Sequence, residues 1–311
     1  MFEIETHRLE KKFGSFTAVN AIDLQVKKGE IFGFLGPNGA GKTTTIKMLT
    51  TLAAPTSGTA TIAGFDVATQ PAKVRSRIGV VPQSFSLFEE LSPMENLWYI
   101  GKLNEIPNKE IESKSIELLK AVTLYDKRDV PSGGFSGGMK QRLSLAASLL
   151  HEPDILFMDE PTTGLDPQSR IAMREITREL NKKGVTVVYT THDMDEAEKL
   201  CDRIAIMDHG NIIAIGTSDE LKRKVSKYEI AEIGAPDASK ETIEELKKLP
   251  FVHSVEKDGS QLVCEVSDGG EMFGKLSDFF KKKHQQVSEI RIRKLSLEDV
   301  FIKLTKKDLR E

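Results

Sequence analysis

A short apolar segment that runs directly into a glycine-rich turn constrains the fold of this chain more than any other feature. Residues 31–35 are mostly apolar and read as a buried strand, and Gly36-x-x-x-x-Gly41-Lys42-Thr43 follows at once. Residues 44–52 then have the pattern of a helix. Glycines between a strand and a helix let consecutive backbone N–H groups surround a polyphosphate at the positive end of the helix dipole. The order therefore predicts a phosphate-binding loop rather than an ordinary turn.

The side chains of this loop indicate what it binds. Lys42 is expected to reach the β- and γ-phosphates of a nucleotide as a point charge, and Thr43 to offer its hydroxyl to Mg²⁺. The residues expected to contact the nucleotide run from the first glycine into the first helical turn, namely Gly36, Pro37, Asn38, Gly39, Ala40, Gly41, Lys42, Thr43 and Thr44.

Composition and charge argue against several classes of protein. The 311 residues have a net charge of −3, and no basic block indicates a nucleic-acid arm, so DNA or RNA is not expected as a partner. Cys201 and Cys264 lie far apart without metal-ligand spacing, which suits a reducing cytosol. No secretory signal and no membrane-spanning stretch is expected, so any spanning segment must belong to another chain.

An aromatic residue near the start is a candidate for stacking on the base. Residues 1–30 alternate apolar and polar, which predicts antiparallel strands that lead into the segment 31–35. Phe13 precedes a flexible glycine in this region and could stack on a purine ring, although a buried structural phenylalanine fits the pattern equally well. Phe16 is the competing candidate.

A glutamine follows another predicted strand. Residues 77–82 read as a strand that stops at a proline, after another short strand between turn residues at 58–64. Gln83 comes next, and its amide could hold a water or a metal ion from a mobile loop. A simply solvated side chain is the alternative.

Residues 85–125 have a helical pattern. Ser92-Pro-Met-Glu95 is a capping box that starts one helix, and residues 108–123 form a second. Phe88, Trp98 and Tyr99 cluster where this helical arm leaves the sheet. Such a cluster is usually core, but on an arm it could also form a docking surface for a partner.

A second possible anion site begins at Ser136, because Ser136, Gly137 and Gly138 stand at the start of a helix that continues through residues 143–150. A capped surface helix is the alternative if this stretch is taken alone.

Two acids and a histidine end two further strands. Residues 155–160 form a buried strand that ends in Asp159 and Glu160, and His192 ends the strand 184–191. Asp159 is placed to hold the Mg²⁺ shell, and Glu160 to orient or deprotonate a water that attacks the γ-phosphate. His192 could hydrogen-bond the same phosphate.

Taken together, these motifs resemble the nucleotide-binding domain of ABC ATPases over residues 1–222. The resemblance implies an α/β fold of the P-loop NTPase type, with a mixed sheet core, an antiparallel β subdomain and a helical arm. It also implies ATP hydrolysis with Mg²⁺, catalytic roles for Glu160, His192 and Gln83, and metal contacts from Thr43, Gln83 and Asp159. In a head-to-tail dimer, Ser136, Gly137 and Gly138 would contact the other subunit's ATP, and Asp166 would contact the other subunit. Met139 replaces a common Gln, and Phe13 a common Tyr.

Residues 223–311 have the order βαββαβ followed by a helix capped by Ser296, which predicts a small ferredoxin-like α+β domain. The ending at 295–304 is similar to that of ABC ATPases paired with separate drug, sodium or polysaccharide exporter permeases.

The expected function is that of an ATPase subunit at the cytoplasmic face of a membrane. It would form a homodimer, or pair with a related ATPase, and drive a separate permease docked near residues 84–100. The alternatives are a soluble ABC ATPase of DNA repair or translation, and a regulatory switch whose tail binds a small molecule or dimerises.

Overall fold

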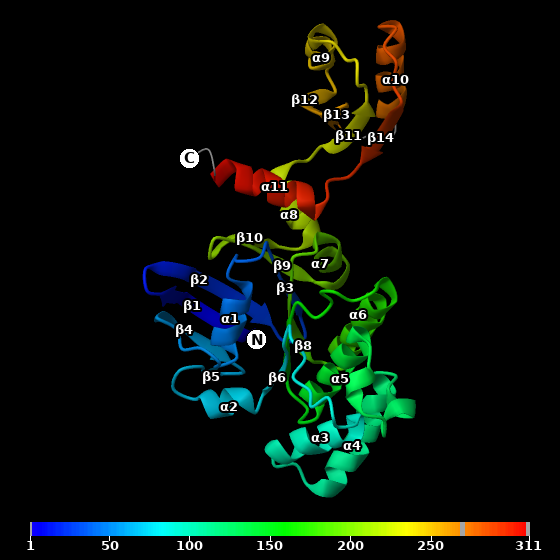
Figure 1. Cartoon of the computed structure of the whole chain (residues 1–311). Coiled ribbons are helices and arrows are strands. Elements are labelled where there is room, and N and C mark those ends of the chain that lie inside the picture. Colours follow the sequence, from blue (N-terminus) through cyan, green and yellow to red (C-terminus); the bar gives the residue numbers. More distant parts are fainter. Residues whose placement is uncertain (1, 268–270, 309–311) are drawn as a thin grey trace. The chain divides into compact units, whose positions relative to one another are not determined.

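A computed structural model describes residues 2–267 and 271–308, and the chain divides into two compact units, Met1–Thr217 and Ser218–Glu311 (Figure 1). The boundary expected from the sequence, between residues 222 and 223, falls inside the helix α8 (Ser218–Val225). Each unit is described by itself.

A mixed sheet forms the centre of the first unit. Its neighbouring strands are parallel except for β9 and β10, which form an antiparallel hairpin. From edge to edge the strands are β10 (Asn211–Gly216), β9 (Arg203–Asp208), β3 (Ile31–Leu35), β8 (Thr186–Thr191), β7 (Ile155–Asp159) and β6 (Ile78–Val81). Every residue of β3, β7 and β8 is buried, because a parallel sheet is covered on both faces. Their carboxyl ends therefore meet at one edge, directly before the predicted site residues.

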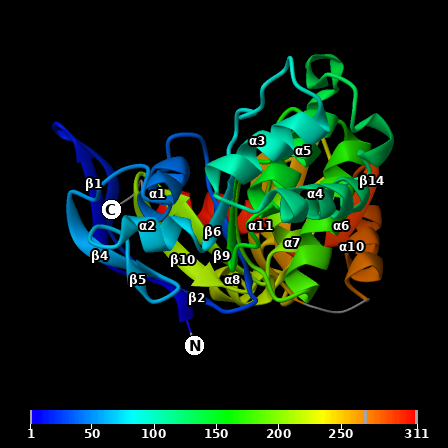
Figure 2. The same cartoon turned by 90° about the horizontal axis from the view of Figure 1, so that it is seen from below.

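An antiparallel sheet lies on one side of the central sheet, and α3 to α6 lie on the other (Figures 1 and 2). Its strands, in order, are β2 (Phe16–Lys27), β1 (Phe2–Phe13), β4 (Ser57–Ile62) and β5 (Phe65–Asp66). Apolar side chains from β1, β2, β4 and the central strands form one core together with α1 (Lys42–Leu49). The two sheets thereby fix the position of α1 and of the loop before it.

The remaining helices of this unit are α2 (Pro71–Arg75), α3 (Pro93–Leu103), α4 (Asn108–Ala121), α5 (Gly137–Leu149), α6 (Pro167–Lys182) and α7 (Met194–Leu200). The capping box predicted at Ser92 is present: Ser92 Oγ accepts the N–H of Glu95 at 3.3 Å, and Glu95 Oε2 accepts the N–H of Ser92 at 2.8 Å. Leu97 of α3 and Leu119 of α4 share a core with α5, so the arm is packed against the helix that begins at Ser136.

The helices α2, α6 and α7 go beyond the sequence prediction. The helix α6 buries only Met173 and Thr177 fully, so its apolar stripe is narrow among charged residues. The helix α7 is too short for a clear helical period. Both are started by an aspartate cap, Asp166 for α6 and Asp193 for α7, each of which accepts a backbone N–H three residues on.

The second unit has the predicted βαββαβ order. Its antiparallel sheet has the order β12-β13-β11-β14. Its elements are α8, β11 (Glu229–Gly234), α9 (Lys240–Leu246), β12 (Val252–Asp258), β13 (Gln261–Val266), α10 (Met272–Lys282), β14 (Glu289–Arg293) and α11 (Leu297–Asp308). A core of its own includes Leu262, Leu276 and Phe280. Cys264 is buried in this core, and burial raises the pKa of its thiol to about 12.

The final helix is tied to the second unit's sheet by charge. Arg293 of β14 donates to Glu232 of β11 at 2.7 Å and to Asp299 of α11 at 2.6 Å. Ser296 caps α11 as predicted, with its hydroxyl accepting the N–H of Asp299 at 3.2 Å. Across both units, none of the helices in the described part of the chain combines the length and the apolar character needed to cross a membrane.

The core of the second unit provides a stability test. Phe280 is 2% exposed, whereas Phe273 on the same helix is 54% exposed. We expect Phe280→Ala to lower the free energy of unfolding of this unit by about 3–5 kcal/mol, through lost burial and the cavity left behind, and Phe273→Ala to stay within about 0.5 kcal/mol of the parent. Hydrogen exchange of the β11 and β13 amides measures both. Equal protection in the two variants would contradict this packing.

Candidate functional site: a nucleotide cleft at the carboxyl edge of the central sheet

The loop between β3 and α1 has a backbone that only glycine permits at two positions. A Cβ on Gly36 would lie 2.2 Å from the carbonyl oxygen of Met207. Gly41, the residue before α1, has φ of +103°, and a Cβ there would lie 2.6 Å from the carbonyl oxygen of Ala18. The loop packs closely against its neighbours, and this packing fixes its path and the start of α1. The first backbone N–H groups of α1 are thereby held in a fixed direction, as an anion site at the start of a helix requires.

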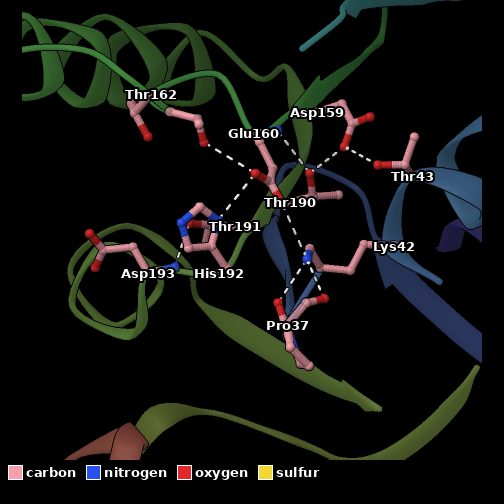
Figure 3. A network of polar contacts seen from close by, with 12 residues as sticks. Pro37, Lys42, Thr43, Asp159, Glu160, Thr162, Thr190, Thr191, His192 and Asp193 are labelled. Atoms are coloured by element: carbon pink, nitrogen blue, oxygen red, sulfur yellow. Dashed lines mark hydrogen bonds and ion pairs between the residues drawn. The ribbon is translucent and has the colours of Figure 1, made fainter. Parts of the chain in front are cut away.

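Lys42 is the first residue of α1, and its ammonium group is held inside the loop. The Nζ atom donates to the carbonyl oxygens of Gly36 at 2.7 Å and Pro37 at 3.0 Å (Figure 3). It also lies 3.2 Å from Glu160 Oε1, and both side chains of this ion pair are about 95% buried. A buried cation surrounded by carbonyl oxygens and one carboxylate is suited to a polyphosphate, which brings more negative charge than these groups provide.

Asp159 lies at the end of β7 and faces the loop. Its Oδ1 accepts from Thr43 Oγ1 at 3.1 Å and from Thr190 Oγ1 at 2.7 Å (Figure 3). Thr43 and Asp159 thus present hard oxygen atoms side by side. Such donors fit Mg²⁺, which takes one or two protein ligands and completes its shell with phosphate oxygens and water. No cluster of three His, Cys, Asp or Glu that could hold a metal alone occurs in residues 2–267 and 271–308.

Glu160 follows Asp159 in a left-handed backbone conformation, with φ of +46°. Thr190 Oγ1 accepts the N–H of Glu160 at 2.9 Å, and Glu160 Oε2 lies 3.1 Å from both Thr163 Oγ1 and His192 Nδ1. Figure 3 shows the Glu160 carboxylate between Lys42 and His192. A non-glycine residue in this conformation is strained, and such strain is found where surrounding contacts fix a functional side chain.

The charge of Glu160 is set by its neighbours. Burial opposes ionisation, but the Lys42 ammonium outweighs it with help from His192 and Thr163, and together they hold the pKa of this carboxyl below its usual value. Glu160 is therefore a carboxylate at neutral pH, which can accept a proton from water or a hydrogen bond from it.

The glycine-rich loop, the start of α1 and Glu160 line a cleft of about 350 Å³. Its walls are Phe16, Ala18, Asn38, Gly39, Gly41, Lys42, Thr43, Thr44, Gln83 and Glu160. Gln83, which follows β6, is thus brought to the loop, and its proposed contact with water or a metal ion stays a prediction. Of the two aromatic candidates, Phe16 lines the cleft, whereas Phe13 is 56% exposed with Lys11 Nζ 5.2 Å from its ring centre.

The second predicted anion site is exposed on the surface. Ser136 caps α5, and its hydroxyl accepts the N–H of Met139 at 3.3 Å. Within the described chain, residues 136–138 do not line the cleft of about 350 Å³. A Cβ on Gly138 would lie 2.2 Å from Ser169 Oγ, which is itself bonded to Asp166 at 2.6 Å. Ser136, Gly137 and Asp166 are therefore exposed on one surface, whereas Gly138 is buried against Ser169.

The structure adds residues that the sequence analysis does not single out. Thr190 joins Asp159 to the backbone of Glu160, and Thr163 holds the Glu160 carboxylate. Thr162 is bonded to Glu196 of α7. Threonine is frequent in strands and loops for reasons of β propensity, so only their nearness to the acid pair could have indicated these roles.

The fold and cleft define a P-loop nucleotide-binding protein, and comparison with known proteins specifies its kind. The family model "ABC transporter" matches residues 19–163, and a second, "ATP-binding protein DrrA1-3-like, C-terminal domain", matches residues 216–305. Among curated proteins, the chain is 40% identical to the daunorubicin/doxorubicin resistance ATP-binding protein DrrA of Streptomyces peucetius, covering 97% of this chain and 92% of that one. It is 36% identical to the linearmycin resistance ATP-binding protein LnrL of Bacillus subtilis (strain 168), covering 99% and 100%.

Solved structures agree with this assignment. An ATP-binding subunit of an ABC transporter is 31% identical with a TM-score of 0.65, covering 72% of this chain and 93% of that one. A dimeric ATP-binding cassette with ADP and Pi is 27% identical with a TM-score of 0.62, covering 69% and 98%. The chain therefore belongs to the ABC transporter family, as an ATP-binding subunit that hydrolyses ATP. Subunits of this family work with membrane permeases and form dimers.

The ion pair of Lys42 and Glu160 predicts that the free energy of unfolding depends on pH in the acidic range. Because the folded pKa of Glu160 is depressed, its contribution is present above the unfolded value near 4.5 and is lost as pH falls through the folded value. In Lys42→Met the main cause of the depression is removed and burial raises the pKa instead. We expect the difference in unfolding free energy between parent and variant to be largest at neutral pH and to shrink below pH 4.5, by urea denaturation without nucleotide. A difference independent of pH would contradict this.

Proposed function

We propose that this chain is the ATPase subunit of an exporter, which drives a separate membrane permease through closure of an ATPase dimer. The names of its relatives support export, since they are ATP-binding proteins of drug resistance and, at 38% identity with a Burkholderia lata protein over 99% of this chain and 98% of that one, of Nod factor export. The subunit would lie at the cytoplasmic face of the membrane, held there by its permease.

We assign the chemistry to the residues at the carboxyl ends of β7 and β8. Lys42 and the N–H groups of α1 bind the β- and γ-phosphates, and Glu160 orients or deprotonates the attacking water. His192 hydrogen-bonds the γ-phosphate. Thr43, Asp159 and Gln83 hold Mg²⁺, which neutralises charge on the phosphates when bound. The observation that carries this assignment is the buried ion pair of Lys42 and Glu160 inside the cleft.

The base-stacking residue is a choice between two rings. Phe16 lines the cleft, which favours it in this conformation, while Phe13 lies across the tight turn that joins β1 to β2. We propose that adenine stacks in this region, on Phe13 as the family resemblance implies or on Phe16 as the cleft lining suggests.

A second copy completes the site. Ser136 and Gly137 form the exposed start of α5, next to Asp166, and Gly138 is buried behind them. The first N–H groups of a helix have no partner within it. We propose that in a head-to-tail dimer these residues contact the γ-phosphate bound by the partner's loop, with Asp166 at the contact between subunits. Closure then excludes water other than the attacking one, so hydrolysis depends on dimerisation.

The permease is proposed to dock on the helical arm. Phe88, Trp98 and Tyr99 are 44%, 50% and 40% exposed, and the rings of Phe88 and Tyr99 meet edge to face at 4.7 Å. An exposed apolar group of this kind marks a contact surface. Asn96 of α3 bonds both the N–H and the carbonyl of Phe88, at 2.9 and 3.0 Å, so the loop that follows Gln83 is fixed to this surface. A shift at Gln83 would thereby reach the permease.

Two substitutions separate binding from chemistry. Glu160→Gln should retain ATP affinity while its turnover falls at least about 100-fold, because a general base is lost. Lys42→Ala should instead weaken ATP affinity at least about tenfold, because a charge-assisted contact with phosphate is lost. Titration with a fluorescent ATP analogue and phosphate release measure the two quantities, with the exposed Glu152→Gln as the control. Turnover of Glu160→Gln within a few-fold of the parent would refute its role, and unchanged affinity of Lys42→Ala would count against the loop assignment.

The docking surface is tested by a charge. We expect Trp98→Asp to abolish association with the permease and transport while ATP affinity stays within about twofold of the parent, since Trp98 lies outside the cleft. Leu52→Asp is the matched control, because Leu52 is also an exposed apolar residue, at 70% exposure. Co-purification with the permease measures association. Equal recovery of both variants would show that the arm is not the docking site.

A further inference from the structure

A buried polar cluster that no proposed catalytic role uses lies behind the Glu160 loop. It consists of Thr162, Tyr189 and Glu196, which are 4%, 0% and 5% exposed. Glu196 Oε2 accepts a short hydrogen bond from Thr162 Oγ1, and Thr162 Oγ1 lies 3.3 Å from Tyr189 Oη. We call these residues the Thr162 cluster. It joins the loop after β7, the strand β8 and the helix α7.

A carboxylate in this place costs free energy. Glu196 Oε1 is buried and accepts no hydrogen bond from the described residues. Burial, with the neighbouring Glu196 carboxylate, raises the pKa of Tyr189 well above its usual value, so the phenol stays neutral and does not balance the charge. Partial compensation comes from the first turn of α7, where Glu196 lies at the positive end of the helix dipole. An apolar side chain would fill the space at lower cost, so packing alone does not account for Glu196.

The cluster closes a ring of contacts around the reacting groups. Thr163, the residue after Thr162, holds the Glu160 carboxylate at 3.1 Å, and that carboxylate contacts His192 at 3.1 Å. Asp193, the residue after His192, caps α7 by accepting the N–H of Glu196 at 3.0 Å. The hydrogen bond that Thr162 donates to Glu196 completes the ring. The spacing of Glu160 and His192 is therefore fixed by the Thr162 cluster as well as by their direct contact.

A second, weaker link runs in parallel. Arg170 Nε donates to the carbonyl oxygen of Leu165 at 3.1 Å, and Arg170 Nη1 lies 3.4 Å from Asp193 Oδ2. Arg170 is 43% exposed, so this contact is screened by solvent. Because Leu165 precedes the proposed dimer contact Asp166, the loop 161–166 and the start of α7 are connected at two points, of which the Thr162 cluster is the buried one.

We propose that Glu196 is a positioning residue for ATP hydrolysis, which holds the loop after Glu160 to α7 through Thr162 and so keeps Glu160 and His192 in register. This inference rests on the proposed roles of Glu160 and His192. Glu196 touches neither nucleotide nor water in this scheme. Its loss leaves ATP binding intact, because Lys42 and the loop 36–43 are held by β3 and α1 instead.

The test uses the full chain and the hydroxyl of Thr162. Thr162→Val removes the donor with little change of shape, Thr162→Ser keeps it, and Glu196→Leu removes the acceptor. Turnover is expressed per nucleotide-binding site, counted by titration with a fluorescent ATP analogue, so that an unfolded fraction does not lower it. We expect Thr162→Val and Glu196→Leu each to lower turnover at least about tenfold with ATP affinity within about twofold, and Thr162→Ser to stay within about twofold.

The double variant shows whether the two residues act as one unit. Thr162→Val with Glu196→Leu should lose no more turnover than either change alone, since one bond is broken in all three. Asp195→Asn, an exposed carboxylate on the same helix, is the control and should keep parent turnover. Parent-like turnover per site in Thr162→Val, equal losses in Thr162→Ser, or losses that multiply in the double variant would each overturn the inference. If Glu196→Leu does not fold, the turnover per site of Thr162→Val decides the test alone.

Measuring Glu160→Gln in parallel distinguishes a failure of the inference about Glu196 from a failure of the proposed function. If it loses turnover while Thr162→Val keeps it, the inference about Glu196 fails and the proposed function stands. If Glu160→Gln itself keeps turnover, the proposed roles fail and the inference falls with them.

Discussion

The buried pair of Lys42 and Glu160 is the interaction on which the site depends. The two side chains meet at 3.2 Å in a setting where an isolated charge of either sign would be costly. Two carbonyl oxygens complete the ammonium's contacts, and His192 and Thr163 complete those of the carboxylate. In the proposed scheme a triphosphate competes with Glu160 for the same lysine, so binding exchanges one partner of Lys42 for another. Glu160 then lies beside the bound phosphate, where it can orient a water.

Different parts of the first unit hold different groups of the site in place. Parallel strands bring Asp159, Glu160 and His192 to one edge of the sheet, and the antiparallel sheet shares a core with α1 and so fixes the position of that helix. The groups that would complete the site, Ser136 to Gly138, lie near Asp166 with Ser136 and Gly137 exposed, and they do not line the molecule's own cleft as the described residues form it. The account therefore requires a second molecule for hydrolysis, and it connects closure to the helical arm through the loop after Gln83.

Much of this could be predicted from the sequence, because the phosphate loop and the strand-end acids combine a distinctive spacing with a distinctive chemistry. The βαββαβ order of the tail could be predicted from its sequence pattern, and the order of the elements in the structure confirms it. The helices α6 and α7 were harder, since α6 has a narrow apolar stripe and α7 is short. Thr190 and the Thr162 cluster could not be found from sequence, since their roles arise from contacts between residues 27 or more positions apart or from a single buried oxygen.

The central claim is that two copies of this chain close around two ATP molecules, each held between the two copies, and the mass of the protein in solution tests it most directly. With Glu160→Gln and saturating Mg-ATP, light scattering after size exclusion should give the mass of two chains, and Ser136→Arg in the same background should return the mass to one chain. A single-chain mass for Glu160→Gln in every nucleotide state, with ATP bound, would contradict the account.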